Sequence, residues 1–196
     1  QRNWEPFAFP PESINAVVLT HAHLDHVGYL PRLVADGFKG TVFCTAGTAD
    51  LCRLVLPDSA RIQEEDAKQA NKQGYTKHAP ALPPYTETDA ARALSLMHPV
   101  AYGKPIEIAA GTTIQFSPAG HLLGSAFVLC TLGNGKRLLF GGDLGRYNRP
   151  VLPDPAAALG ADLVLVESTY GDRDHEADDN GEALAEVIRD TAERKG

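Results

Sequence analysis

Three histidines and one aspartate fall within six consecutive positions of this chain, at His21, His23, Asp25 and His26. Imidazole nitrogens and carboxylate oxygens are ligands that suit zinc, and they also accept manganese or iron. Alternate side chains of an extended segment share a face, so the first two histidines can converge on one ion. A turn into the next helix can then direct the aspartate and the last histidine towards a second ion. The spacing therefore predicts one wall of a two-metal site.

Two further ligand candidates end apolar runs elsewhere in the chain. His121 follows residues 112–118 and Asp143 follows residues 138–140, and both lie beside glycines that allow close backbone approach. A carboxylate such as Asp143 can bridge two cations about 3.5–4 Å apart, which is the geometry of two-metal hydrolysis. Two such ions lower the pKa of a bound water towards about 7, which makes hydroxide available at neutral pH. The chemistry expected of the site is therefore hydrolysis.

The elements that position the first cluster follow from the apolar pattern. Residues 14–20 predict a strand buried on both faces, residues 27–37 a helix, and residues 40–45 a second strand parallel to the first. Residues 48–74 have a helical pattern that we expect to break at Pro57. The histidine cluster would then lie where a buried strand turns into a helix.

The second half of the chain changes from helical to strand periodicity. Thr86 and Asp89 form a capping-box pattern that begins a helix. The later elements are expected as strands at residues 105–118, 124–143 and 161–169, a hairpin turn at 133–135 and a helix at 181–196. Strand ends in this half would therefore carry His121 and Asp143.

Composition narrows the class of protein. The 196 residues suit one domain, and the formal net charge of −7 argues against general nucleic-acid binding. It does not argue against a nuclease, because a metal centre can supply positive charge locally. No apolar run approaches the roughly 20 residues of a membrane helix, and the first residues lack a signal-peptide pattern. Three cysteines without metal-type spacing are expected to be buried free thiols, which suits a cytoplasmic protein: Cys44, Cys52 and Cys130.

These segments together resemble the metallo-β-lactamase superfamily. The residues that match its second, third and fourth motifs are His21, His23, Asp25, His26, His121 and Asp143. The resemblance implies an α/β fold, a four-layer αβ/βα sandwich with a dinuclear site at the sheet ends. It implies that the first of two Zn²⁺ ions is held by His21, His23 and His121. The second would be held by Asp25 and His26, with Asp143 as the bridge.

Residues 164–173, with the sequence VLVESTYGDR, resemble the first motif of the β-CASP branch, whose members are nucleic-acid-processing nucleases. In that branch the acidic residue, here Glu167, orients a histidine from a later segment. We count it as a catalytic residue together with Asp25, a metal ligand that would hold the orientation of the hydroxide. An acidic helix cap or surface residue after a strand is the alternative for Glu167.

The resemblance extends to the subgroup that contains the cleavage and polyadenylation endonuclease and its prokaryotic relatives. It implies a metal-dependent phosphodiester hydrolase that acts on RNA, with single-stranded RNA as the partner and products that carry a 5′-phosphate and a 3′-hydroxyl. Three arginines near the expected edge of the site could meet phosphates, although solvated surface positions are an equal alternative: Arg146, Arg149 and Arg173. Three other histidines are expected in ordinary surface or core positions: His78, His98 and His175.

We also expect the chain to be an internal fragment of a longer protein. It begins with glutamine, its last helical pattern reaches the final residue, and neither the early acidic motif nor the two late histidines of the branch is found. Residues 1–175 would be a partial metallo-β-lactamase-like domain and residues 176–196 the truncated start of the β-CASP region. In such a fragment the second metal site is short of one protein ligand. Missing strands would leave an unpaired sheet edge, which favours self-association or a homodimer.

Two other functions are open from the sequence alone. A small-molecule metallohydrolase of the same fold, such as a thioesterase or lactonase, would use the same ligands. A non-catalytic subunit of an RNA-processing complex would typically have lost ligands, and all six expected in this span are present.

Overall fold

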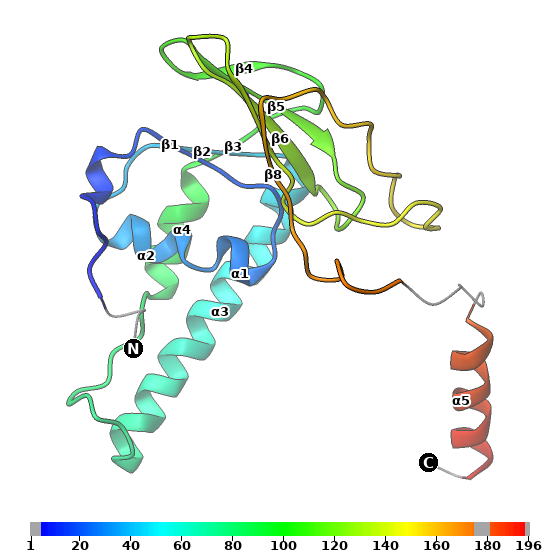
Figure 1. Ribbon diagram of the computed structural model, residues 1–196. Coiled ribbons are helices and arrows are strands. Elements are labelled where there is room, and N and C mark those ends of the chain that lie inside the picture. The colour runs from blue at the N-terminus through cyan, green and yellow to red at the C-terminus, as the bar shows by residue number, and fades with distance from the viewer. Residues whose placement is uncertain (1–4, 175–180, 195–196) are drawn as a thin grey trace.

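Two β-sheets packed face to face form the centre of the computed structural model, which describes residues 5–174 and 181–194 (Figure 1). The first sheet is parallel and has the order β1-β2-β3, with strands Ala16–Val18, Thr41–Cys44 and Met97–Pro99. The second has the order β4-β5-β6-β7-β8, with strands Ile106–Ala109, Thr112–Pro118, Ala126–Thr131, Arg137–Phe140 and Leu163–Leu165. Its neighbouring strands are antiparallel except β7 and β8, which run parallel.

Helices cover the outer face of the first sheet (Figure 1). They are α1 (Leu24–Val27), α2 (Leu30–Ala35), α3 (Ala46–Gln73) and α4 (Glu87–Ser95), and a short 3₁₀-helix, η2 (Pro11–Ser13), precedes β1. Cys52 and Leu56 of α3 and Ala93 of α4 pack with Val42 of β2 in one buried apolar cluster. The predicted parallel pair with a helical crossover is confirmed, with Val17 opposite Val42.

A second apolar cluster lies between the sheets. Phe43 of the first sheet packs with Ile114, Phe116 and Val128 of the second. The outer face of the second sheet, including Phe127, is covered by an extended segment at residues 156–161. The described residues therefore form helix, sheet and sheet, which are three of the four layers expected from the sequence.

Two local predictions were wrong, and one strand was missed. The strand predicted at residues 14–20 is the shorter β1, and its residues are only half-buried because it is an outer strand of its sheet in the described part of the chain. The single helix predicted at residues 27–37 is two, since α1 begins earlier, at Leu24, and α2 follows with Pro31 in its first turn. Strand β3 was not predicted, because its three residues carry no apolar alternation.

The expected break at Pro57 is also wrong, because Pro57 lies inside α3, a continuous helix of 28 residues. A proline inside a helix costs about 3 kcal/mol, since it lacks an N–H and its ring crowds the preceding turn. Leu56 and Ala60, on either side of Pro57, are fully buried against the core. Packing of the same helix face before and after Pro57 offsets this local cost.

The turn chemistry read from the sequence is confirmed. Thr86 and Asp89 form a complete capping box at the start of α4, with the Thr86 side chain accepting from the Asp89 N–H. The turn at residues 133–135 joins β6 to β7, and Gly135 has the positive φ of 82° that such a turn needs. Cys44 and Cys52 are buried free thiols and Cys130 is a half-buried one.

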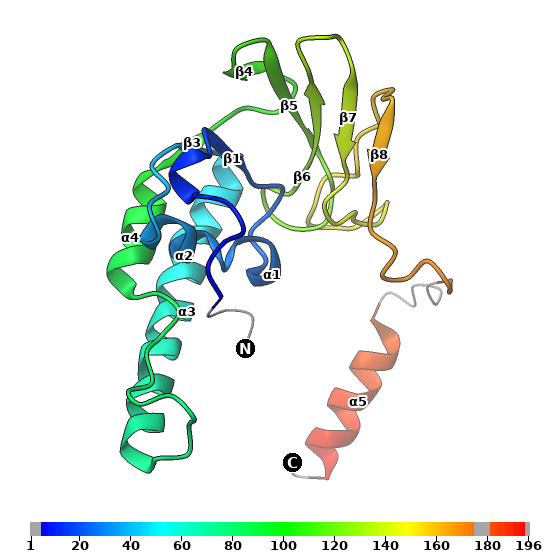
Figure 2. The same cartoon turned by 60° about the vertical axis from the view of Figure 1, so that its left-hand side comes forward.

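The C-terminal part of the described chain is the least packed. Helix α5 (Glu182–Glu193) has no buried residue and stands apart from the sheets in both views (Figures 1 and 2). The apolar side chains of β8 are exposed, as are Leu184, Val187 and Ile188 of α5. Among the helices of the described residues, none combines the length and apolar character needed to cross a membrane.

Candidate metal centre

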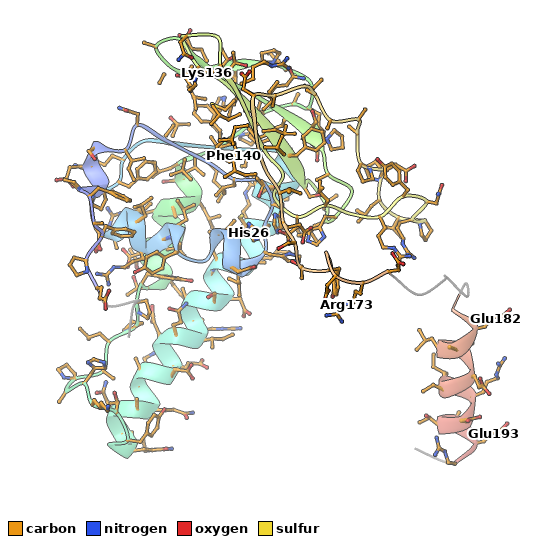
Figure 3. All side chains as sticks on the ribbon, viewed as in Figure 1. His26, Lys136, Phe140, Arg173, Glu182 and Glu193 are labelled. Carbon is orange, nitrogen blue, oxygen red and sulfur yellow. The ribbon has the colours of Figure 1, made fainter. Side chains whose placement is uncertain are left out.

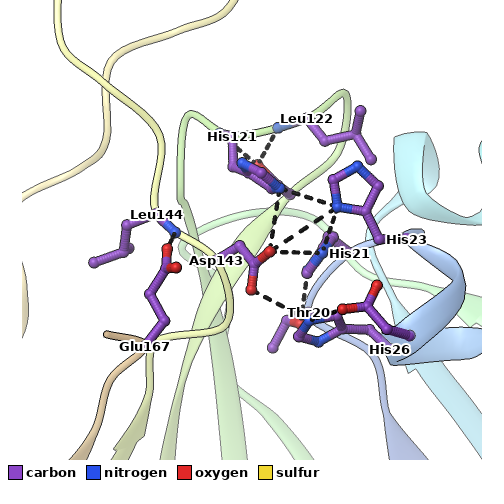
Figure 4. Close-up of polar contacts among 11 residues, drawn as sticks. Thr20, His21, His23, His26, His121, Leu122, Asp143, Leu144 and Glu167 are labelled. Atoms are coloured by element: carbon purple, nitrogen blue, oxygen red, sulfur yellow. Dashed lines mark hydrogen bonds and ion pairs between the residues drawn. The ribbon is translucent and has the colours of Figure 1, made fainter. Parts of the chain in front are cut away.

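Three imidazole nitrogens and one carboxylate oxygen converge among the loops that follow β1, β5 and β7 (Figure 4). The ligand atoms of His21, His23, His121 and Asp143 all lie within 4.8 Å of one another. His21 Nε2 and His121 Nε2 each lie 3.1 Å from His23 Nδ1. Asp143 Oδ2 lies 3.6, 4.0 and 3.4 Å from the nitrogens of His21, His23 and His121 respectively.

These separations fit one tetrahedral ion. Zinc–ligand bonds of about 2.0–2.2 Å place the corners of a tetrahedron roughly 3.3–3.6 Å apart. The separations range from 3.1 to 4.0 Å, on both sides of that value. Three imidazoles and a carboxylate are also ligands that zinc accepts. The donor set and its spacing therefore fit a divalent ion of this kind.

His26 and Asp25 lie on the other side of the same carboxylate. His26 Nε2 is 3.2 Å from Asp143 Oδ1, the oxygen turned away from the group of four, and 3.6 Å from Asp25 Oδ2. Both residues lie on α1, whose N-cap is His23, and the centre of the His26 ring lies 4.1 Å from that of His21. Asp143 thus presents Oδ2 to the three histidines of the first group and Oδ1 to His26. The Asp25 carboxyl is mostly exposed and lies outside the group of four.

His21 is the buried member of the cluster. Burial, followed by the nearby His26, lowers the pKa of His21 from 6.5 to about 4. The imidazole is therefore neutral at pH 7, which is the form that binds metals. Thr20 Oγ1 lies 3.1 Å from His21 Nδ1, so this contact turns the other ring nitrogen towards Asp143 (Figure 4).

The loop that carries His121 is held by a hydrogen bond within the loop and by hydrogen bonds to the start of α3. Ser125 Oγ accepts a hydrogen bond of 3.0 Å from the His121 N–H. The Gly124 carbonyl accepts hydrogen bonds from the hydroxyls of Thr45 and Thr48 at the start of α3, at 2.6 and 2.9 Å. A Cβ on Gly124 would lie 2.2 Å from the Thr48 amide nitrogen. The glycine beside His121 thus allows the close backbone approach expected from the sequence.

Glu167 is joined to the loop of Asp143 rather than to the histidines. Its Oε1 accepts a 2.8 Å hydrogen bond from the backbone N–H of Leu144, the residue after Asp143 (Figure 4). This hydrogen bond is the main cause that holds the pKa of Glu167 below its usual value. The carboxylate is therefore charged at neutral pH and holds the backbone next to Asp143.

The other residues considered from the sequence are more dispersed. Arg146 and Arg149 line a pocket next to His121 and Asp143. Arg173 is not among the residues that line it and lies after β8, with its guanidinium 5.5 Å from the centre of the Tyr170 ring (Figure 3). The three remaining histidines are not in the group of ligands. His98, on β3, contacts Phe43 of β2, His78 is exposed, and His175 lies outside the described residues.

Sequence reasoning missed the residues that hold the ligands in place. Thr20, Ser125 and the Leu144 backbone N–H each contact a candidate ligand or its loop. Thr20 and Ser125 stand beside or near histidines in the sequence, which is a weak signal for such a role. The partner of Glu167 carries no side-chain signal, because it is a backbone group.

A model of the β-lactamase superfamily domain matches residues 1–195 of the chain. The chain belongs to the β-lactamase superfamily. The prediction made from the histidine and aspartate motifs is therefore confirmed at the level of the superfamily. Two sheets with helices on one outer face agree with that fold.

Two curated proteins are similar to most of this chain. Ribonuclease TTHA0252 of Thermus thermophilus is 42% identical over 174 residues, which are 89% of this chain and 36% of that protein. The transcription termination factor FttA of Methanococcus maripaludis is 34% identical over 194 residues, which are 96% of this chain and 28% of that protein. The chain thus spans about a third of the length of these curated relatives. A solved metallo-β-lactamase of Cronobacter sakazakii with a HARLDQ motif is 23% identical, with a TM-score of 0.44, over 73% of this chain and 46% of the other.

Proposed function

We propose that this chain is part of a metal-dependent phosphodiester hydrolase that cleaves RNA. The observation that carries the proposal is the convergence of His21, His23, His121 and Asp143 on one point, with His26 on the second oxygen of Asp143. A relative named as a ribonuclease, 42% identical, favours RNA over the small molecules used by thioesterases and lactonases. Retention of all six candidate ligands argues against a non-catalytic subunit.

The metals of the proposed site are two Zn²⁺ ions, with manganese or iron as alternatives. His21, His23 and His121 would hold the first, Asp25 and His26 the second, and Asp143 would bridge them. Divalent ions held in this way supply a nucleophile from water at neutral pH and neutralise charge on phosphate oxygens. The second set contains fewer protein groups than the first, so we expect it to bind more weakly in this chain.

Asp25 and Glu167 are the proposed catalytic and positioning carboxylates. Asp25, exposed beside His26, can accept a hydrogen bond from the attacking water and hold its orientation. Glu167 holds the backbone of Leu144, and through it the position of Asp143.

The segment at residues 164–173 supports assignment to the β-CASP branch, with residues 176–196 as the start of that region. We propose single-stranded RNA as substrate and the cytoplasm as the place of action.

Metal analysis together with a cleavage assay tests the function. The purified chain should retain one tightly held zinc and lose a second on gel filtration, and it should cleave single-stranded RNA slowly to products with a 5′-phosphate. A full-length protein that contains this chain should cleave the same RNA rapidly. Hydrolysis of a thioester or a lactone in place of RNA by that protein would contradict the proposal.

Replacing Glu167 tests the positioning role. Glu167→Ala removes the acceptor for the Leu144 N–H, and we expect zinc affinity to fall about 10- to 100-fold, as for other groups that orient metal ligands. Glu167→Gln keeps an acceptor oxygen, so its zinc affinity should fall less than that of Glu167→Ala. Isothermal titration with zinc measures both, and Glu186→Ala on exposed α5 is the control. Unchanged zinc affinity in Glu167→Ala would show that Glu167 does not position Asp143.

We further propose that the chain self-associates through the exposed edge of β8. This strand is the outer strand of its sheet in the described residues, and Val164 is exposed. An unpaired apolar edge is a template for pairing with another copy. Light scattering should show mass that rises with concentration, and Val164→Lys should reduce the effect, whereas Leu54→Lys on exposed α3 should not. A monomer across the micromolar range would contradict this prediction.

A further inference from the structure

A pocket of about 450 Å³ adjoins the candidate metal centre and shares His121 and Asp143 with it. Pockets that bind small ligands commonly measure about 300–1,000 Å³. Arg146 and Arg149 line this pocket, a few residues after Asp143 along the chain. Two arginines at one site stand out in a chain whose formal net charge is −7. Their position in the same pocket as His121 and Asp143 places positive charge beside the candidate metal centre.

The loop that carries the two arginines is attached at several points. Gly145 N–H donates to the Ala119 carbonyl at 2.8 Å, which ties the start of the loop to the end of β5. The Asn148 N–H donates to Asp154 Oδ1 at 2.7 Å, which closes the loop on itself. These hydrogen bonds fix the backbone on which the guanidinium groups are carried.

The rest of the pocket wall has a different character. Leu144, Leu152 and Tyr170 supply apolar and aromatic surface. The acidic group of Glu167 also lines the pocket, but its carboxylate accepts the Leu144 N–H. Arginines for phosphate and an aromatic ring for a base are the two features with which proteins hold single-stranded nucleic acid.

We propose that this pocket is a nucleotide subsite. Arg146 and Arg149 bind a phosphate next to the one that is cleaved, and Tyr170 with its apolar neighbours contacts the base or ribose of that nucleotide. The inference rests on the proposed function and adds to it a place for the substrate strand beside the metal ligands. Arginine suits this role because its planar fork can pair with two phosphate oxygens at once.

Binding of a short fluorescent single-stranded RNA to the metal-free chain tests the subsite. Affinity is measured by fluorescence anisotropy over a range of salt concentrations, with thermal unfolding as the check that each variant is folded. Because each single-strand phosphate contact contributes a slope of about −0.7 to log affinity against log salt, and the two arginines share one phosphate, the double variant Arg146→Ala/Arg149→Ala should make the slope shallower by about 0.7. Each single variant should make it shallower by a part of that amount. Arg146→Lys keeps the charge and should keep the slope. Tyr170→Ala should weaken binding about 5- to 150-fold, the range expected for loss of base stacking.

Arg61→Ala is the matched control, since Arg61 pairs with Asp58 on the exposed face of α3 and its loss changes the net charge equally. Its RNA affinity and salt slope should equal those of the wild type. Wild-type slopes in both pocket arginine variants would overturn the subsite, and so would failure of the wild type to bind RNA. Zinc titration of the same samples separates the two proposals. Zinc binding together with unchanged RNA binding in the arginine variants would contradict the subsite alone. Absence of zinc binding would contradict the proposed function.

Discussion

Asp143→Ala is expected to abolish tight zinc binding and to reduce RNA cleavage to background. Asp143 has one oxygen, Oδ2, 3.4 Å from His121 in the first group of ligands. Its other oxygen, Oδ1, lies 3.2 Å from His26. Groups that only orient a metal ligand cost 10- to 100-fold in affinity when removed, so loss of the bridge should exceed about 100-fold. Isothermal titration with zinc measures the loss.

The comparison with Asp143→Asn and Asp50→Ala makes this result specific. Asp143→Asn keeps one carbonyl oxygen and should retain part of the affinity for one ion. Asp50 pairs with Arg53 on the surface of α3, so Asp50→Ala removes the same charge away from the site and should bind zinc as the wild type does. Tight binding of zinc by Asp143→Ala would show that the histidines alone hold the metal.

Gly145→Ala is expected to damage the same site without removing any ligand. A Cβ at Gly145 would lie 1.8 Å from the Gly120 carbonyl oxygen and 2.6 Å from the His121 amide nitrogen. Both contacts are with backbone, so the loop of Asp143 and the loop of His121 must move apart. We expect the free energy of unfolding to fall by about 1–3 kcal/mol, the usual cost of overpacking, and zinc to bind more weakly.

Gly160→Ala provides the control for this substitution. No atom lies within 4 Å of a Cβ built at Gly160, and its φ is not positive. Its free energy of unfolding should stay within about 0.5 kcal/mol of the wild type, as for most surface substitutions. Thermal unfolding and zinc titration compare the two variants. Wild-type stability and zinc affinity in Gly145→Ala would show that the loops can separate without moving His121 relative to Asp143.

Local features of the fold could be predicted because they depend on near neighbours in the chain. The capping box of Thr86 and Asp89 and the hairpin turn at residues 133–135 involve residues two to four apart, and both are confirmed. The break predicted at Pro57 was wrong because burial of Leu56 and Ala60 by other elements outweighs a local cost. The length and exposure of β1 likewise depend on what lies beside it in the sheet.

The sequence by itself determined the ligand types, the strand-to-helix turn that separates His23 from His26, and the superfamily. The ligand types and the turn follow from short-range spacing and residue chemistry, and the superfamily follows from the resemblance of these motifs to its members. Only the tertiary structure decided that His21, His23, His121 and Asp143 meet at tetrahedral distances, because their segments are brought together by packing of one sheet on the other. It also showed the hydrogen-bond partner of Glu167, a backbone N–H that no side-chain pattern marks. The two arginines became candidates for one phosphate for the same reason: a shared pocket is a property of the folded loops.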